Sequence, residues 1–256
     1  MTVSKTSEGT AAGYYIYAIA DAAELPEAEL DASGLEGAQV ELLSSGTVSA
    51  CVSELRKRRV RPDRRSLSAH MGVTRRLMER ATVLPVSFGV VAKTRADVRE
   101  LLARNSESFV EQLARVRGKV EMGLRVLWDV PNVFEYFVNT RADLRAARDT
   151  IGDIRAANRD DMIELGRFFE QVLGEERERY VEQVVAVLAA HEIPHARGKV
   201  RNERDVMNLA CLVARDELEG FDRAVGEAAS GFDNNFTFDV SGPWAPASFV
   251  DVTLET

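Results

Sequence analysis

The stretch KVEMGLRVLW, residues 119–128, decides the fold class because it is the clearest strand signal in the sequence. Large apolar residues alternate strictly with other residues along it, which is the period of a strand with one buried face. Gly118 comes directly before the strand, where a glycine commonly ends a helix in the left-handed conformation. Pro131 follows the strand and stops it. We therefore expect a new domain to begin near Gly118.

After this strand the sequence predicts the order β-α-β-β-α-β, which is that of a ferredoxin-like unit. Apolar residues at three- and four-residue spacings predict the helices, and short β-branched or apolar runs predict the strands. The expected elements are helices over 161–190 and 216–229 and strands over 193–200, 206–213 and 235–240. Residues 132–157 are partly helical in pattern, and we interpret them as an insertion.

Before this strand the pattern predicts a mixed sheet with helices. The expected elements are a strand over 14–20, a hairpin over 39–43 and 47–53, a helix over 67–81, a strand over 83–91, and a helix over 97–117 that breaks near Asn105 or Ser106. The predicted fold class is therefore α+β with two domains. The first is a mixed α+β domain over 14–117, and the second is a ferredoxin-like (βαββαβ) domain with a helical insertion and a C-terminal tail over 118–256.

Composition excludes some classes of function. The chain has 256 residues, of which 45% are hydrophobic, and a net charge of -8, which disfavours a general nucleic-acid-binding surface. No stretch approaches the roughly 18 apolar residues of a membrane span, and the first ten residues lack a signal-peptide core. The two cysteines, Cys51 and Cys211, lie far apart among apolar residues, as expected for buried thiols. We expect a soluble, cytoplasmic protein.

Four short blocks occur in one order along the chain: YIYAI at 15–19, TVLPVSFG at 82–89, GKVEMGLRV at 118–126 and GPWAPASFV at 242–250. Together with His70, they resemble blocks of the GvpF/GvpL family of gas vesicle proteins. The chain departs from the family pattern at Ala18, Ser87, Met122 and Ala247, where the family has glycine, arginine, tryptophan and tyrosine.

The resemblance implies a two-domain protein that is associated with gas vesicles in the cytoplasm. It implies an accessory or minor structural role in assembly, through binding of the small hydrophobic shell protein and of other vesicle accessory proteins. Such a role needs no catalytic residue and no cofactor. Two other classes stay open at this point: a ferredoxin-like regulatory module that binds a small ligand, and a hydrolase whose site has no recognised motif.

A basic run is the first candidate for a partner contact. Residues 56–65 hold seven basic side chains and one acidic side chain, and the partner-binding candidates within them are Arg56, Arg58, Arg59 and Arg61. The run lacks the interleaved aromatic residues that stack on bases, so we expect no nucleic-acid binding. Either a solvated loop leading into the next helix or a contact with an acidic partner fits this pattern.

The C-terminal aromatic residues are the second candidate. Trp244 and Phe249 stand beside Pro243 and Pro246 in a tail that we expect to be extended and rigid. Such a tail either packs back onto the domains or offers its aromatic side chains to a partner.

The segment His191-Glu192-Ile193-Pro194-His195 matches the HExxH pattern of zinc proteases, which requires both histidines on one helix. Pro194 would break that helix, so we expect a helix end and no metal site. His70 lies on the apolar side of its predicted helix, where we expect a hydrogen-bonded histidine in the core or between the domains.

Overall fold

The computed structural model describes residues 13–25, 29–57, 59–152 and 158–252. Within these ranges the chain divides into two compact units. The first unit comprises residues 13–121 and 243–252, and the second comprises residues 122–242. The chain is a mixed α+β protein in which each unit contains one antiparallel sheet with helices.

The sheet of the first unit has the order β2-β3-β4-β1-β5, and β6 also pairs with β1. Its strands are β1 (Gly13–Asp21), β2 (Glu29–Ser33), β3 (Gln39–Ser45), β4 (Val48–Leu55), β5 (Val83–Pro85) and β6 (Val91–Ala92), with the short 3-10 helix η1 (Leu35–Gly37) after β2. The predicted hairpin is confirmed: Ser45 faces Val48 in the β3–β4 register, and Gly46 adopts the positive φ of 62° that the tight turn requires.

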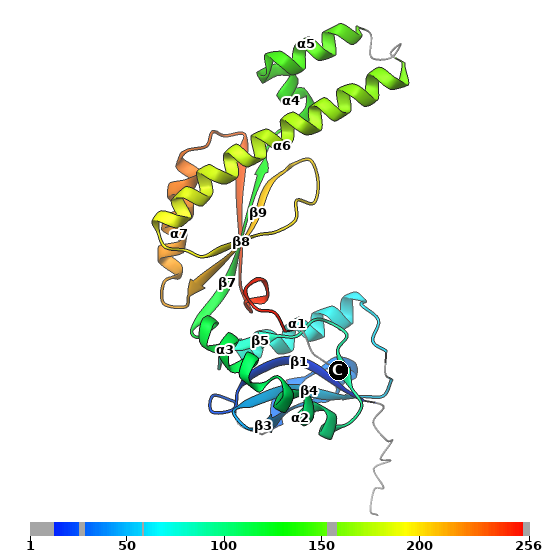
Figure 1. Ribbon diagram of the computed structural model, residues 1–256, viewed down its shortest axis with the longest axis vertical. Helices are drawn as coiled ribbons and strands as arrows, with labels where there is room; N and C mark the ends of the chain where they lie inside the picture. The colour runs from blue at the N-terminus through cyan, green and yellow to red at the C-terminus, as the bar shows by residue number, and fades with distance from the viewer. Residues whose placement is uncertain (1–12, 26–28, 58, 153–157, 253–256) are drawn as a thin grey trace, which may run out of the picture. The chain divides into compact units, whose positions relative to one another are not determined.

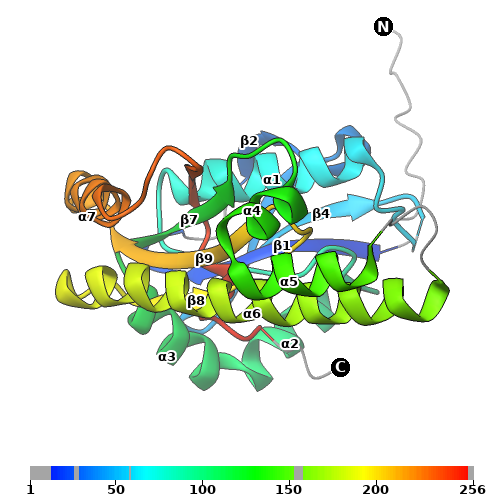
Figure 2. The ribbon, with the colours of Figure 1, turned by 90° about the horizontal axis from the view of Figure 1, so that it is seen from above.

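Helices cover both faces of this sheet, as Figures 1 and 2 show. Helix α1 (Arg64–Met78) lies on one face, and α2 (Arg95–Arg104) and α3 (Ser106–Val116) lie on the other. This arrangement explains the nearly continuous apolar sequence of β1, whose residues from Tyr15 to Ala20 are all buried. The predicted break in the 97–117 helix is confirmed at Asn105, which ends α2 and precedes α3.

The prediction of one strand over 83–91 was wrong. The segment forms two short strands, β5 and β6, because Gly89 takes a φ of 97° between them and the chain turns there. The sequence analysis also missed β2, which carries an irregularity between Leu30 and Ser33. Strand β2 contributes Ala32 and Ser33 to one wall of a groove beside α1.

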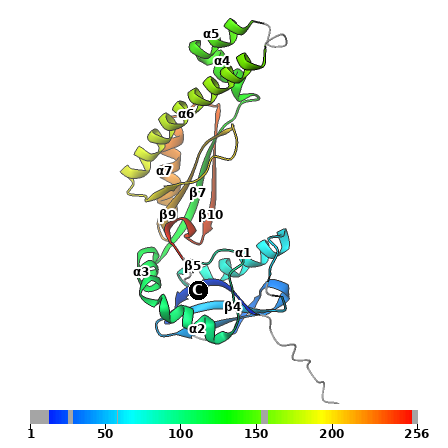
Figure 3. The same ribbon diagram turned by 45° about the vertical axis from the view of Figure 1, so that its right-hand side comes forward.

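The sheet of the second unit has the order β10-β7-β9-β8. Its strands are β7 (Lys119–Trp128), β8 (His195–Arg197), β9 (Asp205–Ala214) and β10 (Phe236–Trp244). Its helices are α4 (Val133–Thr140), α5 (Ala142–Ile151), α6 (Arg159–Ala190) and α7 (Leu218–Ser230). Figures 1 and 3 show α6 and α7 on one face of the sheet, with α4 and α5 beside the N-terminal half of α6.

The strict alternation predicted for residues 119–128 is confirmed, because every second side chain from Val120 to Trp128 is buried. An ion pair fastens β7 to β9: Arg125 Nε lies 3.0 Å from Oδ1 of Asp205, whose side chain is fully buried. The HExxH segment does not lie on one helix. Helix α6 ends at Ala190, Glu192 takes a φ of 53°, and His195 belongs to β8.

Cys51 and Cys211 are both buried, as the sequence predicted. Burial raises the pKa of the Cys51 thiol. Among the described residues no helix has the length and apolar character of a membrane span.

Candidate functional site

The basic run leads into the N-terminus of α1, which has a capping residue. Asp63 caps the helix, since its Oδ1 accepts a hydrogen bond of 2.8 Å from the Ser66 amide. This bond holds the pKa of Asp63 below its usual value. The prediction of a loop that runs into a helix is thereby confirmed.

The predicted partner-binding residues Arg56, Arg59 and Arg61 are exposed on the segment between β4 and α1. Arg58 lies outside the described residues. The backbone of this segment is anchored at its start, because the Arg56 amide donates to Oε2 of Glu36 over 3.2 Å. The start of the segment is therefore tied to η1, and Arg56, Arg59 and Arg61 follow it along the exposed chain.

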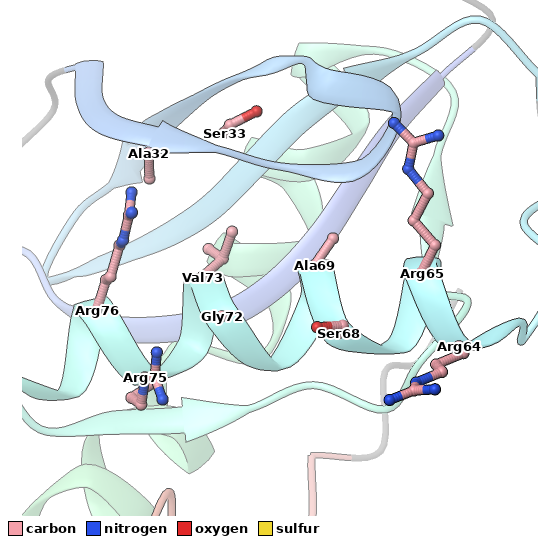
Figure 4. A pocket seen from close by; sticks show the side chains of 10 residues that line it. All are labelled: Ala32, Ser33, Arg64, Arg65, Ser68, Ala69, Gly72, Val73, Arg75 and Arg76. Atoms are coloured by element: carbon pink, nitrogen blue, oxygen red, sulfur yellow. The ribbon is translucent and has the colours of Figure 1, made fainter.

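Beside this segment, α1 and β2 enclose an open groove of about 650 Å³, which we call the α1–β2 groove. Its lining residues are Ala32, Ser33, Arg64, Arg65, Ser68, Ala69, Gly72, Val73, Arg75 and Arg76. Figure 4 shows the two arginine pairs at the two ends of the groove, with the small side chains of α1 between them. The lining thus combines four cations with a floor of small residues.

The charge of this region is not balanced locally. In the described part of the chain, Arg64, Arg65, Arg75 and Arg76 form no ion pair with a carboxylate. Arg76 instead donates from Nη1 to the Asp31 carbonyl over 3.1 Å. Residues 56–80 hold ten basic and two acidic side chains, a charge of +8, so the rest of the chain carries -16. We call Arg56, Arg59, Arg61 and the four groove arginines the basic face.

The side of α1 toward the sheet is fixed by His70. Its Nδ1 lies 3.0 Å from the Tyr15 hydroxyl, which also accepts a hydrogen bond of 3.1 Å from the Gly89 amide. The rings of Tyr17 and Phe88 complete a cluster around His70. Burial lowers the pKa of His70 and raises the pKa of Tyr15 to about 12. The predicted hydrogen bond of His70 is confirmed, but its ring is half-buried within the first unit and not fully buried in the core. The contact with Tyr15 ties α1 to β1.

Sequence reasoning missed Arg75 and Arg76 as site residues. The signal that could have identified them is a spacing of eleven residues, which is close to three helical turns. This spacing places Arg75 on the same helix face as Arg64, and Arg76 on the same face as Arg65. The groove itself could not be predicted, because β2 was not recognised.

The C-terminal tail packs back onto the first unit. The side-chain amide of Gln112 forms two hydrogen bonds with the backbone of Asp251, at 2.9 and 2.6 Å. Arg115 donates to the Phe249 carbonyl over 2.8 Å, and the Glu121 carboxylate accepts from Ser248. Residues 243–252 therefore belong with α3 in the first unit, whereas the sequence analysis placed them in the second domain.

The two groups of predicted site residues do not form one site. Phe249 is half-buried in the 3-10 helix η2 (Ala247–Phe249), and Trp244, at the end of β10, is 40% exposed. The tail contacts α3, which lies on the opposite face of the sheet from α1 and the basic face. The basic face and the tail are therefore two separate candidate surfaces.

Comparisons with known proteins agree on one family. Gas vesicle protein F of a Streptomyces species is 26% identical over 241 residues, which cover 93% of this chain and 99% of the relative. Gas vesicle protein F1 of Halobacterium salinarum is 25% identical over 244 residues, covering 94% of this chain and 93% of the relative.

Solved structures show the same fold. The crystal structure of GvpF from Anabaena aligns with a TM-score of 0.78 and 23% identity, covering 94% of this chain and 99% of that one. The crystal structure of GvpF from Microcystis aeruginosa aligns with a TM-score of 0.75 and 21% identity, covering 94% of this chain and 100% of that one. The family model of the gas vesicle synthesis proteins GvpL/GvpF matches residues 13–251. The chain therefore belongs to the GvpL/GvpF family of gas vesicle proteins.

Proposed function

We propose that this protein acts in gas vesicle assembly by binding the small hydrophobic shell protein with its basic face. The observation that carries the proposal is the concentration of charge: residues 56–80 carry +8 in a chain of net charge -8. Cations gathered on one face repel one another and so disfavour the folded protein, and an acidic partner would relieve that repulsion. Membership of a gas vesicle synthesis family supports a vesicle protein as that partner.

The same helix also exposes apolar side chains. On α1, Leu67 is 38% exposed and Met71 is 53% exposed, one turn apart. Apolar residues beside cations form a surface suited to a hydrophobic protein that carries acidic groups. The physical need is clear: shell subunits with a gas-facing apolar surface must be kept from aggregating before they are assembled. Holding and delivering such subunits requires binding and no chemical step.

We also interpret the second unit as ferredoxin-like. Its element order along the chain is β7, the helices α4 to α6, β8, β9, α7 and β10, and its strand order is β10-β7-β9-β8. This order supports the β-α-β-β-α-β assignment, with α4 and α5 as the insertion. In the proposed function this unit is a rigid support, and the protein works in the cytoplasm where vesicles are assembled.

The experiment is co-expression with a gas vesicle shell protein, followed by pull-down of the tagged chain. The test variant is Arg56→Glu with Arg59→Glu and Arg61→Glu. The matched control is Arg159→Glu with Arg167→Glu and Arg223→Glu, which makes the same change in net charge on exposed helices of the second unit. We expect the wild type and the control to retain the shell protein and the test variant to lose most of it. Equal retention by all three proteins, or none by the wild type, would refute the proposal.

A further inference from the structure

The α1–β2 groove has a specific arrangement of charge. Its ten lining residues include four arginines and no acidic side chain. The arginines fall into two pairs, Arg64 with Arg65 and Arg75 with Arg76, which are eleven residues apart on one helix. At 1.5 Å per residue the two pairs are separated by about 16 Å along the helix axis. A ligand that satisfies both pairs must therefore be elongated and carry negative charge at two separated positions.

The floor between the two pairs is shallow and small. Between the pairs, α1 contributes Ser68, Ala69, Gly72 and Val73 to the lining, opposite Ala32 and Ser33 of β2. In Figure 4 Ala69 and Val73 point toward β2, and Ser68 points to the outer side of the helix. A Cβ atom added at Gly72 would meet nothing within 4 Å, so space is open directly above the helix backbone. Small side chains of this kind allow the backbone of another element to approach α1 closely.

Several ligand classes fit this arrangement poorly. A single phosphate would engage only one arginine pair, because the pairs are about 16 Å apart. Nucleic-acid strands usually stack on aromatic side chains, and no aromatic residue lines the groove. An added β-strand would need the backbone of β2, but the Asp31 carbonyl already accepts from Arg76 and the strand is irregular at this point.

We propose that the α1–β2 groove binds an acidic helix of a partner protein, with carboxylates eleven residues apart and small residues between them. Carboxylates at this spacing lie on one face of a helix and match the separation of the two arginine pairs. Each arginine presents a planar fork of donors suited to a carboxylate. The inference rests on the proposed function in one respect only, namely that the basic face serves a protein partner.

The test uses fluorescein-labelled synthetic peptides and the full chain, without any vesicle protein. The first peptide is an alanine-rich helix with glutamate pairs eleven residues apart. The second has glutamine at those positions, and the third has the same composition with the glutamate pairs five residues apart. Fluorescence anisotropy at low and moderate salt gives the dissociation constants. We expect the first peptide to bind most tightly, and we expect its dissociation constant to increase as the salt concentration rises.

Two protein variants locate the binding. Arg65→Glu with Arg76→Glu should weaken the binding of the first peptide by about a hundredfold, which is roughly tenfold for each lost charged contact. Gly72→Leu should also weaken it, by filling the floor without a change of charge. The control, Arg167→Glu with Arg223→Glu, matches the net charge of the double groove variant and should bind as the wild type does. Circular dichroism melting establishes that each variant is folded.

Several results would overturn the inference. These are equal binding of the first two peptides, tighter binding of the third peptide, no effect of either groove variant, or displacement of the first peptide by equimolar inorganic phosphate or a single-stranded oligonucleotide. The result is separable from the proposed function. Peptide binding without retention of the shell protein would refute the proposed function alone, and retention of the shell protein without peptide binding would refute the groove alone.

Discussion

His70 should link the stability of the first unit to pH just below neutrality. Its ring is half-buried among Tyr15, Tyr17 and Phe88, and burial lowers its pKa below the ordinary value of 6.5. Between the lowered pKa and pH 6.5 the unfolded chain binds a proton at His70 that the folded chain does not. The free energy of unfolding should therefore fall as the pH is lowered through the window just below 6.5.

The change that tests this is His70→Gln, followed by urea unfolding between pH 5 and 8. The unfolding free energy of the wild type should rise with pH through this window, whereas that of the variant should rise less. Gln171→Ala, on the exposed side of α6, removes no titratable group and should retain the wild-type slope in this window. An unchanged slope in His70→Gln would contradict the assignment.

Gly72 is a second residue whose substitution should change the stability of the protein in a predictable direction. It lies inside α1, where glycine disfavours the helix, and a Cβ atom at this position meets nothing within 4 Å. Gly72→Ala should therefore stabilise the protein by about 1 kcal/mol, measured by chemical denaturation. Gly89→Ala is the control of opposite sign, because Gly89 also has open space but takes a φ of 97°, which strains an alanine. Destabilisation by Gly72→Ala would mean that the groove floor is closed.

At the scale of elements, the C-terminal tail is held by side chains of α3. Gln112, itself buried, both donates to and accepts from the backbone of Asp251. Gln112→Ala removes both hydrogen bonds to the tail, together with one to Ser108, and should cost about 1–3 kcal/mol of stability. The more specific readout is hydrogen exchange, in which the Asp251 amide should lose protection. Gln171→Ala, on the exposed side of α6, should leave that amide unchanged, and full protection in Gln112→Ala would show that other contacts hold the tail.

The elements that the sequence predicted well are those whose pattern is local. The alternation over 119–128 and the break at Asn105 each follow from neighbours within a few residues. Strand β2 was missed because its residues, ELDAS, alternate over only five positions and include no β-branched or aromatic residue. The tail contact joins residues 139 positions apart through a side-chain amide and the backbone, and no periodic pattern encodes such a pairing. The groove could not be predicted for the same reason, since one of its walls is β2.

At the scale of the whole molecule, charge is segregated along the chain. The protein has a sequence pI of about 5.1, yet residues 56–80 alone carry +8. A protein of this pI with evenly mixed charge would not bind a cation exchanger at pH 7, whereas a concentrated basic face provides a local attachment site. We therefore expect the wild type to be retained on a sulfonate column at low salt despite its net charge of -8.

The variant that removes this behaviour should be Arg65→Glu with Arg76→Glu. Arg167→Glu with Arg223→Glu makes the same change in net charge and should leave retention in place, because it does not touch the basic face. The eluting salt concentration is the measurement, and a lower value for the groove variant alone is the expected result. Equal elution of the two variants would mean that net charge, and not its placement, governs retention. The basic face would then lack the concentrated field on which both the shell-protein contact and the acidic-helix site depend.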